Sequence, residues 1–183
     1  MSWNKLMVAG GLALLVLVAA TPSFAADKQA IDTGVGDTLA KFYALNAGNR
    51  QLAEQAAGML VFPRVTKAGI GIGGEHGEGA LRIGDKIVDY YSIAGGSIGA
   101  TLGVARSSLI IMFTTKDALD KFQASRGWQV GVDANIALVS VGAGGQYDSN
   151  TLRKPVVGFV FDQKGLLADV SLEGGKISKL KVE

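Results

Sequence analysis

The residues of this chain whose types and spacing suggest chemistry lie close together. Gly69, Gly71 and Gly74 have the G-x-G-x-x-G spacing of a dinucleotide-binding loop, in which glycines lead from a strand into a helix that holds a pyrophosphate at its N-terminus. The next residues, 75–79, read Glu-His-Gly-Glu-Gly, which favours a turn with two carboxylates and would repel a phosphate. No helix pattern follows. The sequence therefore argues against nucleotide binding.

His76 is the only histidine, and with Glu75 and Glu78 beside it the chemistry to consider is acid/base catalysis or metal binding. On a strand only Glu78 shares a side with His76, and two ligands do not form a structural zinc site. The chain has no cysteine, so any Ser-His-Asp or Cys-His arrangement would depend on His76. An acid/base hydrolase remains an alternative only if these carboxylates, or Asp89 with Asp85, converge in a pocket. We expect no catalytic residue, no metal and no cofactor.

Basic and aromatic side chains suggest binding instead. Arg64, Lys67 and Arg106 are cations suited to anionic lipid head groups, since each basic residue near a charged membrane contributes about 1 kcal/mol. Tyr90 and Tyr91 suit an interface that is half apolar and half wet. The competing interpretation places the tyrosines in the core and the cations on a solvated surface.

A glycine-rich segment follows the tyrosines. Because strand side chains alternate between faces, Gly95, Ser97, Gly99, Thr101 and Gly103 lie on one side, which is nearly bare. Glycine weakens a strand, so such a run indicates a bend or the close approach of another backbone or a ligand. The sequence leaves open whether a helix or a lipid fills this face.

Two helical segments are expected around the strands. Residues 27–59 have a helical period, interrupted at 46–49, and Pro63 ends this region. Thr114, with Asp117 three residues on, predicts the cap of a short inserted helix.

The remaining segments have a period of two, which predicts strands. We expect residues 69–74 and 78–83 to pair around a turn at 75–77, and Gly84-Asp85 to form a second turn. A strand pair is expected over 128–147. A hairpin over 155–173 and a short edge strand over 176–182 complete the series, which indicates an α+β fold.

The first 25 of the 183 residues have the pattern of a signal peptide. Lys5 precedes an apolar run over 6–20, and a small-residue cleavage pattern ends at Ala25. Cleavage leaves 17 basic and 16 acidic residues, a net charge of +1, which does not favour a nucleic-acid binder. Without cysteine the chain is not a lipoprotein. We expect an exported protein, periplasmic or secreted and peripheral on a membrane, with residues 26–183 as a single domain: a helical region over 26–60 and a sheet-rich core over 61–183.

A series of motifs resembles the SYLF domain family in order and spacing, across residues 50–175. The matching segments are Lys67–Gly74, Gly77–Gly79, Tyr91–Gly103, Leu119–Phe122 and Gly165–Gly174.

The resemblance implies a lipid-binding module without known catalysis. Eukaryotic relatives are associated with phosphoinositide membranes and actin, and bacterial relatives are exported proteins described as lipid-binding. Membrane binding in eukaryotic relatives is linked to an N-terminal amphipathic segment, which corresponds to Asp27–Leu45 here. The family often has an acidic residue where this chain has Ser107-Ser108.

Together these observations favour a curved, largely antiparallel, glycine-rich sheet, barrel-like or sandwich-like, with N-terminal helices and one short inserted helix. The expected function is non-catalytic binding of anionic phospholipid or a membrane surface at the cell envelope, with an envelope protein as a further partner and with neither nucleic acid nor actin. The alternative is a structural or protein-interaction domain of the envelope that binds no lipid directly.

Overall fold

The structure is a computed structural model that describes residues 27–142, 147–165, 172 and 174–183, with the backbone alone over 97–102. Within these residues the elements are, in chain order, α1 (Lys28–Leu45), α2 (Gly48–Gln55), β1 (Gly58–Ile83), β2 (Lys86–Phe113), α3 (Lys116–Ala124), β3 (Trp128–Gln129), β4 (Ala137–Ser140), α4 (Ser149–Leu152), β5 (Val156–Gly165) and β6 (Lys176–Lys179). The predicted signal peptide lies outside the described residues.

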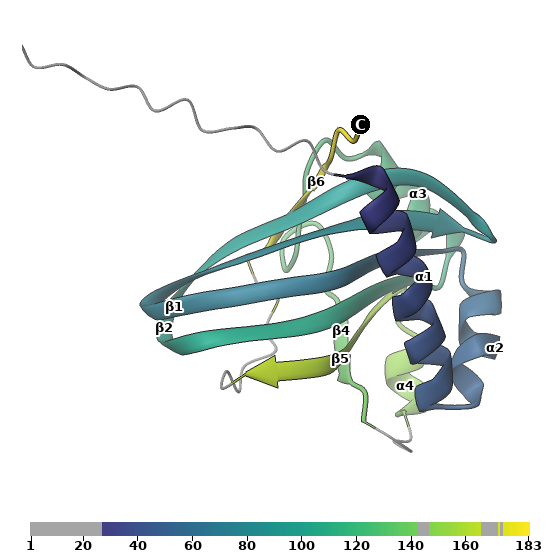
Figure 1. The fold of residues 1–183 in the computed structure, drawn as a ribbon. Helices are drawn as coiled ribbons and strands as arrows, with labels where there is room; N and C mark the ends of the chain where they lie inside the picture. Colours follow the sequence, from purple (N-terminus) through teal and green to yellow (C-terminus); the bar gives the residue numbers. More distant parts are fainter. Residues whose placement is uncertain (1–26, 143–146, 166–171, 173) are drawn as a thin grey trace, which may run out of the picture.

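One sheet of six strands organises the described part of the chain (Figure 1). The strand order is β3-β6-β2-β5-β4, and β1 pairs with β2 off this path. All pairings are antiparallel except the parallel pair β4 and β5. The predicted α+β fold with a curved, largely antiparallel sheet is confirmed.

β1 and β2 form one long hairpin that folds back on itself. The turn at Gly84-Asp85 joins the two strands as predicted, and their register shifts between Ile70 and Ile72, where Gly71 has a φ of 72°. The two halves of β1 then lie against each other. A Cβ on Gly79 would lie 2.2 Å from the Val61 carbonyl oxygen, and one on Gly69 would lie 2.4 Å from the Cα of Gly73. Glycine is therefore required where β1 packs on itself.

The sheet has a hydrophobic core on each face, because apolar residues occupy alternate positions on both faces of its strands. The core that includes α3 contains Leu60, Phe62, Leu81, Ile93, Leu109, Ile111, Phe113, Phe122 and Trp128. The core beneath α1 contains Ile31, Val35, Leu39, Phe42, Val61, Ile110, Met112, Phe159 and Phe161. The apolar stripe of α1 is thus covered by the sheet.

The helix starts follow from local capping. The Asp27 side chain accepts a hydrogen bond from the Gln29 amide at 2.9 Å and begins α1. Thr115 caps α3 by accepting from the Ala118 amide at 3.3 Å, one residue after the predicted Thr114.

Several strand predictions were wrong in detail. Residues 75–77 are not a turn; they lie inside β1 and pair with 93–95 of β2. Over 128–147 the described residues form strands only at β3 and β4, at opposite ends of the strand order. β6 lies between β3 and β2 and is not an edge strand. The second half of the hairpin predicted over 155–173 falls on 166–173, most of which lies outside the described residues.

Candidate functional site

The bend of the hairpin carries an exposed apolar surface. Ile70 is 84% exposed, Ile72 is 73% exposed and Val104 is 54% exposed. We call these three residues the apolar corner. In Figure 1 the bend of β1 and β2 lies at one end of the molecule, and α1, α2 and α4 lie at the other. Three large apolar side chains exposed at a projecting bend make this surface a candidate for interaction.

One face of the hairpin connects the apolar corner to cationic residues. Thr66 pairs with Arg106, Ala68 with Val104 and Ile70 with Leu102. Because side chains two residues apart share a face, Arg106 and Val104 lie on the same side as Ile70. At about 3.3 Å per residue, Arg106 lies about 7 Å behind Val104 and about 13 Å behind Ile70 along the strands. An apolar end and a basic band therefore follow one another along this face.

The basic band consists of Arg106 and its cross-strand neighbour Lys164 on β5. Lys164 Nζ lies 3.7 Å from Asp162 Oδ1, while the other carboxylate oxygen of Asp162 lies 2.9 Å from Lys41 Nζ. The Lys41 ammonium, together with Lys164, lowers the pKa of Asp162. Among the residues that the structure describes, no carboxylate forms an ion pair with Arg106. The band thus keeps a net positive charge.

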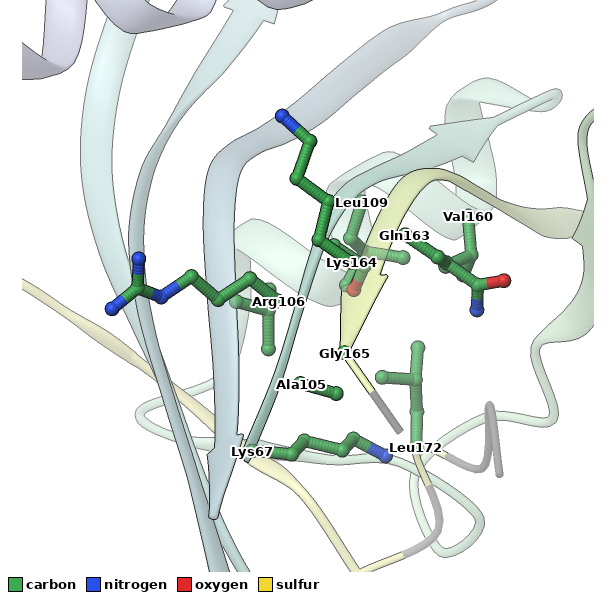
Figure 2. Close-up of a pocket in the computed structure, with 11 residues that line it drawn as sticks. Lys67, Ala105, Arg106, Leu109, Val160, Gln163, Lys164, Gly165 and Leu172 are labelled. Atoms are coloured by element: carbon green, nitrogen blue, oxygen red, sulfur yellow. The ribbon is translucent and has the colours of Figure 1, made fainter. Parts of the chain in front are cut away.

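A small cavity lies beside the basic band, between β1, β2 and β5. Its volume is about 30 Å³, and Val65, Lys67, Ala105, Arg106, Ser107, Leu109, Val160, Gln163, Lys164, Gly165 and Leu172 line it. Figure 2 shows Lys67 extending toward Leu172, whereas the ends of Arg106 and Lys164 point away. This space suits a water molecule or two and is too small for a lipid head group. Anion binding here would occur on the surface.

Lys67 is held by an acidic partner. Its Nζ lies 3.3 Å from Glu75 Oε2, and the Glu75 side chain is only 9% exposed. The Glu75 carboxylate lies against two glycines, since a Cβ on Gly95 would lie 2.8 Å from Oε1 and one on Gly175 would lie 2.7 Å from it. The space beside Gly95 is therefore occupied by a carboxylate. Neither a helix nor a lipid is needed to fill it.

The other glycines of the predicted bare face lie around the bend. Gly103 pairs with Gly69 and has a φ of 111°, a conformation that favours glycine. Gly99 lies in β2 within the segment of which only the backbone is described.

The remaining residues predicted for binding lie apart from this face. Arg64 is exposed at the register shift between Phe62 and Val65 and does not line the cavity. The Tyr90 hydroxyl donates a 2.6 Å hydrogen bond to Asp32 of α1. Tyr91 is 3% exposed and packs on Phe122 at 4.9 Å between ring centroids, so it belongs to the core. Tyrosines at a chain's surface and in its core have the same local pattern, so sequence could not separate them.

The residues considered for catalysis do not converge. His76 Nε2 and Glu78 Oε1 lie 3.8 Å apart on an exposed stretch of β1. Asp85 pairs with Arg82 at 2.6 Å, and Asp89 pairs with Lys179. Within the described part of the chain, no three side chains of His, Cys, Asp or Glu are grouped as a metal site would require.

The sequence did not predict that the residues of the apolar corner are exposed. Ile70 and Ile72 stand between glycines in the same way as buried strand residues, and only the fold of the hairpin shows that they are exposed. The available signal was Gly71, which lies between them at the bend.

Residues 94–182 match the family described as Ysc84, Las17-binding protein actin regulator. This match confirms the resemblance to the SYLF family over residues 94–182, and the family implies at most a binding module related to lipids or actin. The matched residues run from the bent part of β2 through β6. No curated protein matches the chain. None of the helices in the described ranges is long and apolar enough to cross a bilayer.

Proposed function

We propose that this chain is an exported, non-catalytic module that docks on anionic phospholipid membranes through the apolar corner and the basic band. The observation that carries the proposal is the order of side chains on one hairpin face: exposed Ile70 and Val104 first, then Arg106 and Lys164.

The spacing on this face fits the depth of a membrane interface. Apolar faces of peripheral proteins enter about 5–10 Å into the boundary between head groups and acyl chains. With the apolar corner at that depth, Arg106 and Lys164 lie level with the phosphates. Each buried isoleucine contributes about 2 kcal/mol and each cation about 1 kcal/mol.

The mode of binding is surface docking and not extraction of a lipid into the cavity beside Lys67. That cavity of about 30 Å³ is too small, and Glu75 already compensates the charge of Lys67. The stripe of α1, which corresponds to the membrane-binding segment of eukaryotic relatives, packs on the sheet through Ile31, Val35 and Phe42. The hairpin bend supplies the apolar surface instead.

The family description names actin regulation, but we propose lipid as the partner of this chain. The pattern over residues 1–25 favours export, and an exported bacterial protein would not meet actin. A non-catalytic role is supported by the separate positions of His76, Asp85 and Asp89. His76 lies 3.8 Å from Glu78, Asp85 pairs with Arg82 and Asp89 pairs with Lys179.

Vesicle flotation of the mature protein tests the docking. We expect binding to vesicles of phosphatidylglycerol mixed with phosphatidylcholine, weaker binding to pure phosphatidylcholine, and loss of binding as salt rises. The double variant Ile70→Ser/Ile72→Ser should lower the partition coefficient roughly a thousandfold, because two isoleucines at about 2 kcal/mol each are lost, and Arg106→Gln should lower it about fivefold. Val88→Ser is the matched control, because Val88 is an exposed apolar residue at the other end of the hairpin.

Equal flotation of the wild type and the Ile70→Ser/Ile72→Ser variant would refute docking through the apolar corner. Failure of the folded wild type to float at low salt would favour the alternative of a protein-interaction domain without direct lipid binding. Export is tested separately by mass spectrometry of the protein recovered from the envelope fraction. The measured mass should correspond to a chain that begins at Ala26.

A further inference from the structure

A second surface feature lies at the helical end of the molecule, away from the apolar corner. Two cavities adjoin there, an inner one of about 190 Å³ and an open outer one of about 500 Å³. Leu52, Gln55 and Leu152 line both, so the two form one groove between α2 and α4. Its size is in the range of small-molecule sites.

The two parts of the groove differ in chemistry. The inner cavity ends on the sheet, where its walls are mainly aliphatic and aromatic: Leu52, Ala56, Met112, Leu152, Val157 and Phe159. The outer cavity adds the amides of Asn46 and Gln51 and the ring of Tyr147. No Asp, Glu, Lys or Arg is among the described residues that line either part. The groove is thus apolar inside and polar but uncharged at its opening.

The apolar inner walls and the uncharged polar opening of the groove determine which class of ligand fits it. An apolar cavity of this size is a poor site for water, which needs two to four polar partners. A phosphate or carboxylate would find no cation among the lining residues, and burying an unpaired charge is costly. An alkyl chain fits the inner walls, with Met112 able to adapt to its shape. Ester carbonyls and hydroxyls suit the side-chain amides, which both donate and accept hydrogen bonds.

We propose that the groove between α2 and α4 binds one acyl chain of an uncharged glycerol-type lipid, with the chain in the inner cavity and the ester and hydroxyl groups beside Asn46, Gln51 and Gln55. This site is separate from the apolar corner and does not depend on membrane docking. The protein then has two lipid contacts of different kinds. The apolar corner and the basic band bind an anionic membrane surface, and the groove binds a single neutral lipid molecule.

Isothermal titration of the mature protein with 1-decanoylglycerol, below its aggregation concentration, tests the proposal. We expect saturable binding to one site. Sodium decanoate has the same chain length with a charged head, and it should bind at least tenfold more weakly. Leu152→Trp, which fills the groove from α4, should weaken binding of 1-decanoylglycerol at least tenfold. Val88→Trp places the same residue at the start of β2, outside the residues that line the groove, and should leave binding unchanged.

If Leu152→Trp fails to fold, as judged by circular dichroism, Ala56→Leu serves as the second filling variant, with the same expected loss. The Ile70→Ser/Ile72→Ser variant should bind 1-decanoylglycerol as the wild type does, even where it no longer floats with vesicles. Absence of saturable binding to the folded wild type would overturn the proposal. Unchanged affinity in a folded filling variant, or tighter binding of decanoate than of 1-decanoylglycerol, would do so equally.

Discussion

Lys67 and Glu75 form an ion pair inside the bend of the hairpin, and the glycines around it make room for the carboxylate. The Glu75 side chain is 9% exposed and that of Lys67 is 23% exposed. A buried pair adds little stability over an apolar pair of the same size, but removing one partner leaves an uncompensated charge. The pair therefore fixes how the two halves of β1 lie near the bend.

Lys67→Met should destabilise the protein by about 2 kcal/mol, below the 3–5 kcal/mol of a fully buried pair because Lys67 is partly exposed. Urea unfolding followed by circular dichroism measures this change. The double variant Lys67→Met/Glu75→Gln should recover most of the loss, because no buried charge remains. Additive losses in the double variant would show that the two side chains do not interact.

Tyr91 makes the stability of the protein depend on pH in the alkaline range. Burial, together with the nearby Asp89 carboxylate, raises the pKa of Tyr91 to about 12 from its ordinary value of 10. The folded state therefore keeps a proton that the unfolded state releases above pH 10, so stability is complete below pH 10 and falls as pH rises toward 12. This shift corresponds to a stability change on the order of 2 kcal/mol.

We expect Tyr91→Phe to remove this part of the alkaline loss and to raise stability near pH 7 by about 1 kcal/mol, because the buried hydroxyl that it removes has no hydrogen-bond partner among the described residues. Urea unfolding at pH 8, 10 and 11.5 compares the two proteins. Parallel stability curves for the wild type and Tyr91→Phe would contradict the assignment.

Among the elements, β1 and β2 determine the shape of the sheet. A 26-residue strand and a 28-residue strand are far longer than usual, and they fit a small domain because the hairpin bends and packs on itself. Gly77 and Gly79 face the other half of β1, where backbone carbonyls leave no room for a Cβ. The glycines are thus a packing requirement of one strand against itself.

Gly79→Ala should destabilise the protein by about 3 kcal/mol, since its Cβ would lie 2.2 Å from a carbonyl oxygen and the backbone must move. Gly36→Ala is the matched control in α1, where nothing lies within 4 Å of the added Cβ, and it should stabilise by about 0.5–1 kcal/mol. Thermal and urea unfolding measure both. Similar effects of the two substitutions would show that β1 does not pack on itself as described.

Part of the arrangement of these elements could be predicted from the sequence. The period of two and the Gly84-Asp85 turn are local signals, and they predicted the strand-rich region, the class of fold and the hairpin turn. Pro63 was expected to end the helical region, but it lies inside β1, and the helices end earlier, at Gln55. The sequence could not show that residues 75–77 remain in a strand, because Glu-His-Gly is also a good turn and only pairing with 93–95 decides between them. The exposure of Ile70 depends on the bend in the same way, whereas Lys67 and Arg106 were predicted from charge alone.

At the scale of the whole molecule, the helices gather at one end and the hairpin bend projects at the other (Figure 1). The projecting end carries the apolar corner with the basic band behind it. The two ends of the molecule therefore differ, and the projecting end suits attachment to a membrane surface. Residues 94–182 match the SYLF family, and the separation of the two ends supports the proposed way in which this chain binds.

Fluorescence of a single labelled cysteine at the hairpin bend tests whether the apolar corner inserts into a membrane. The chain has no cysteine, so Ile72→Cys carries one environment-sensitive nitrobenzoxadiazole label, and Val88→Cys is the matched control at the far end of the hairpin. On addition of anionic vesicles we expect a blue shift and a several-fold rise in emission from the label at residue 72, with no change at residue 88. No change at residue 72 while the protein floats with the vesicles, or equal changes at both positions, would contradict insertion of the apolar corner.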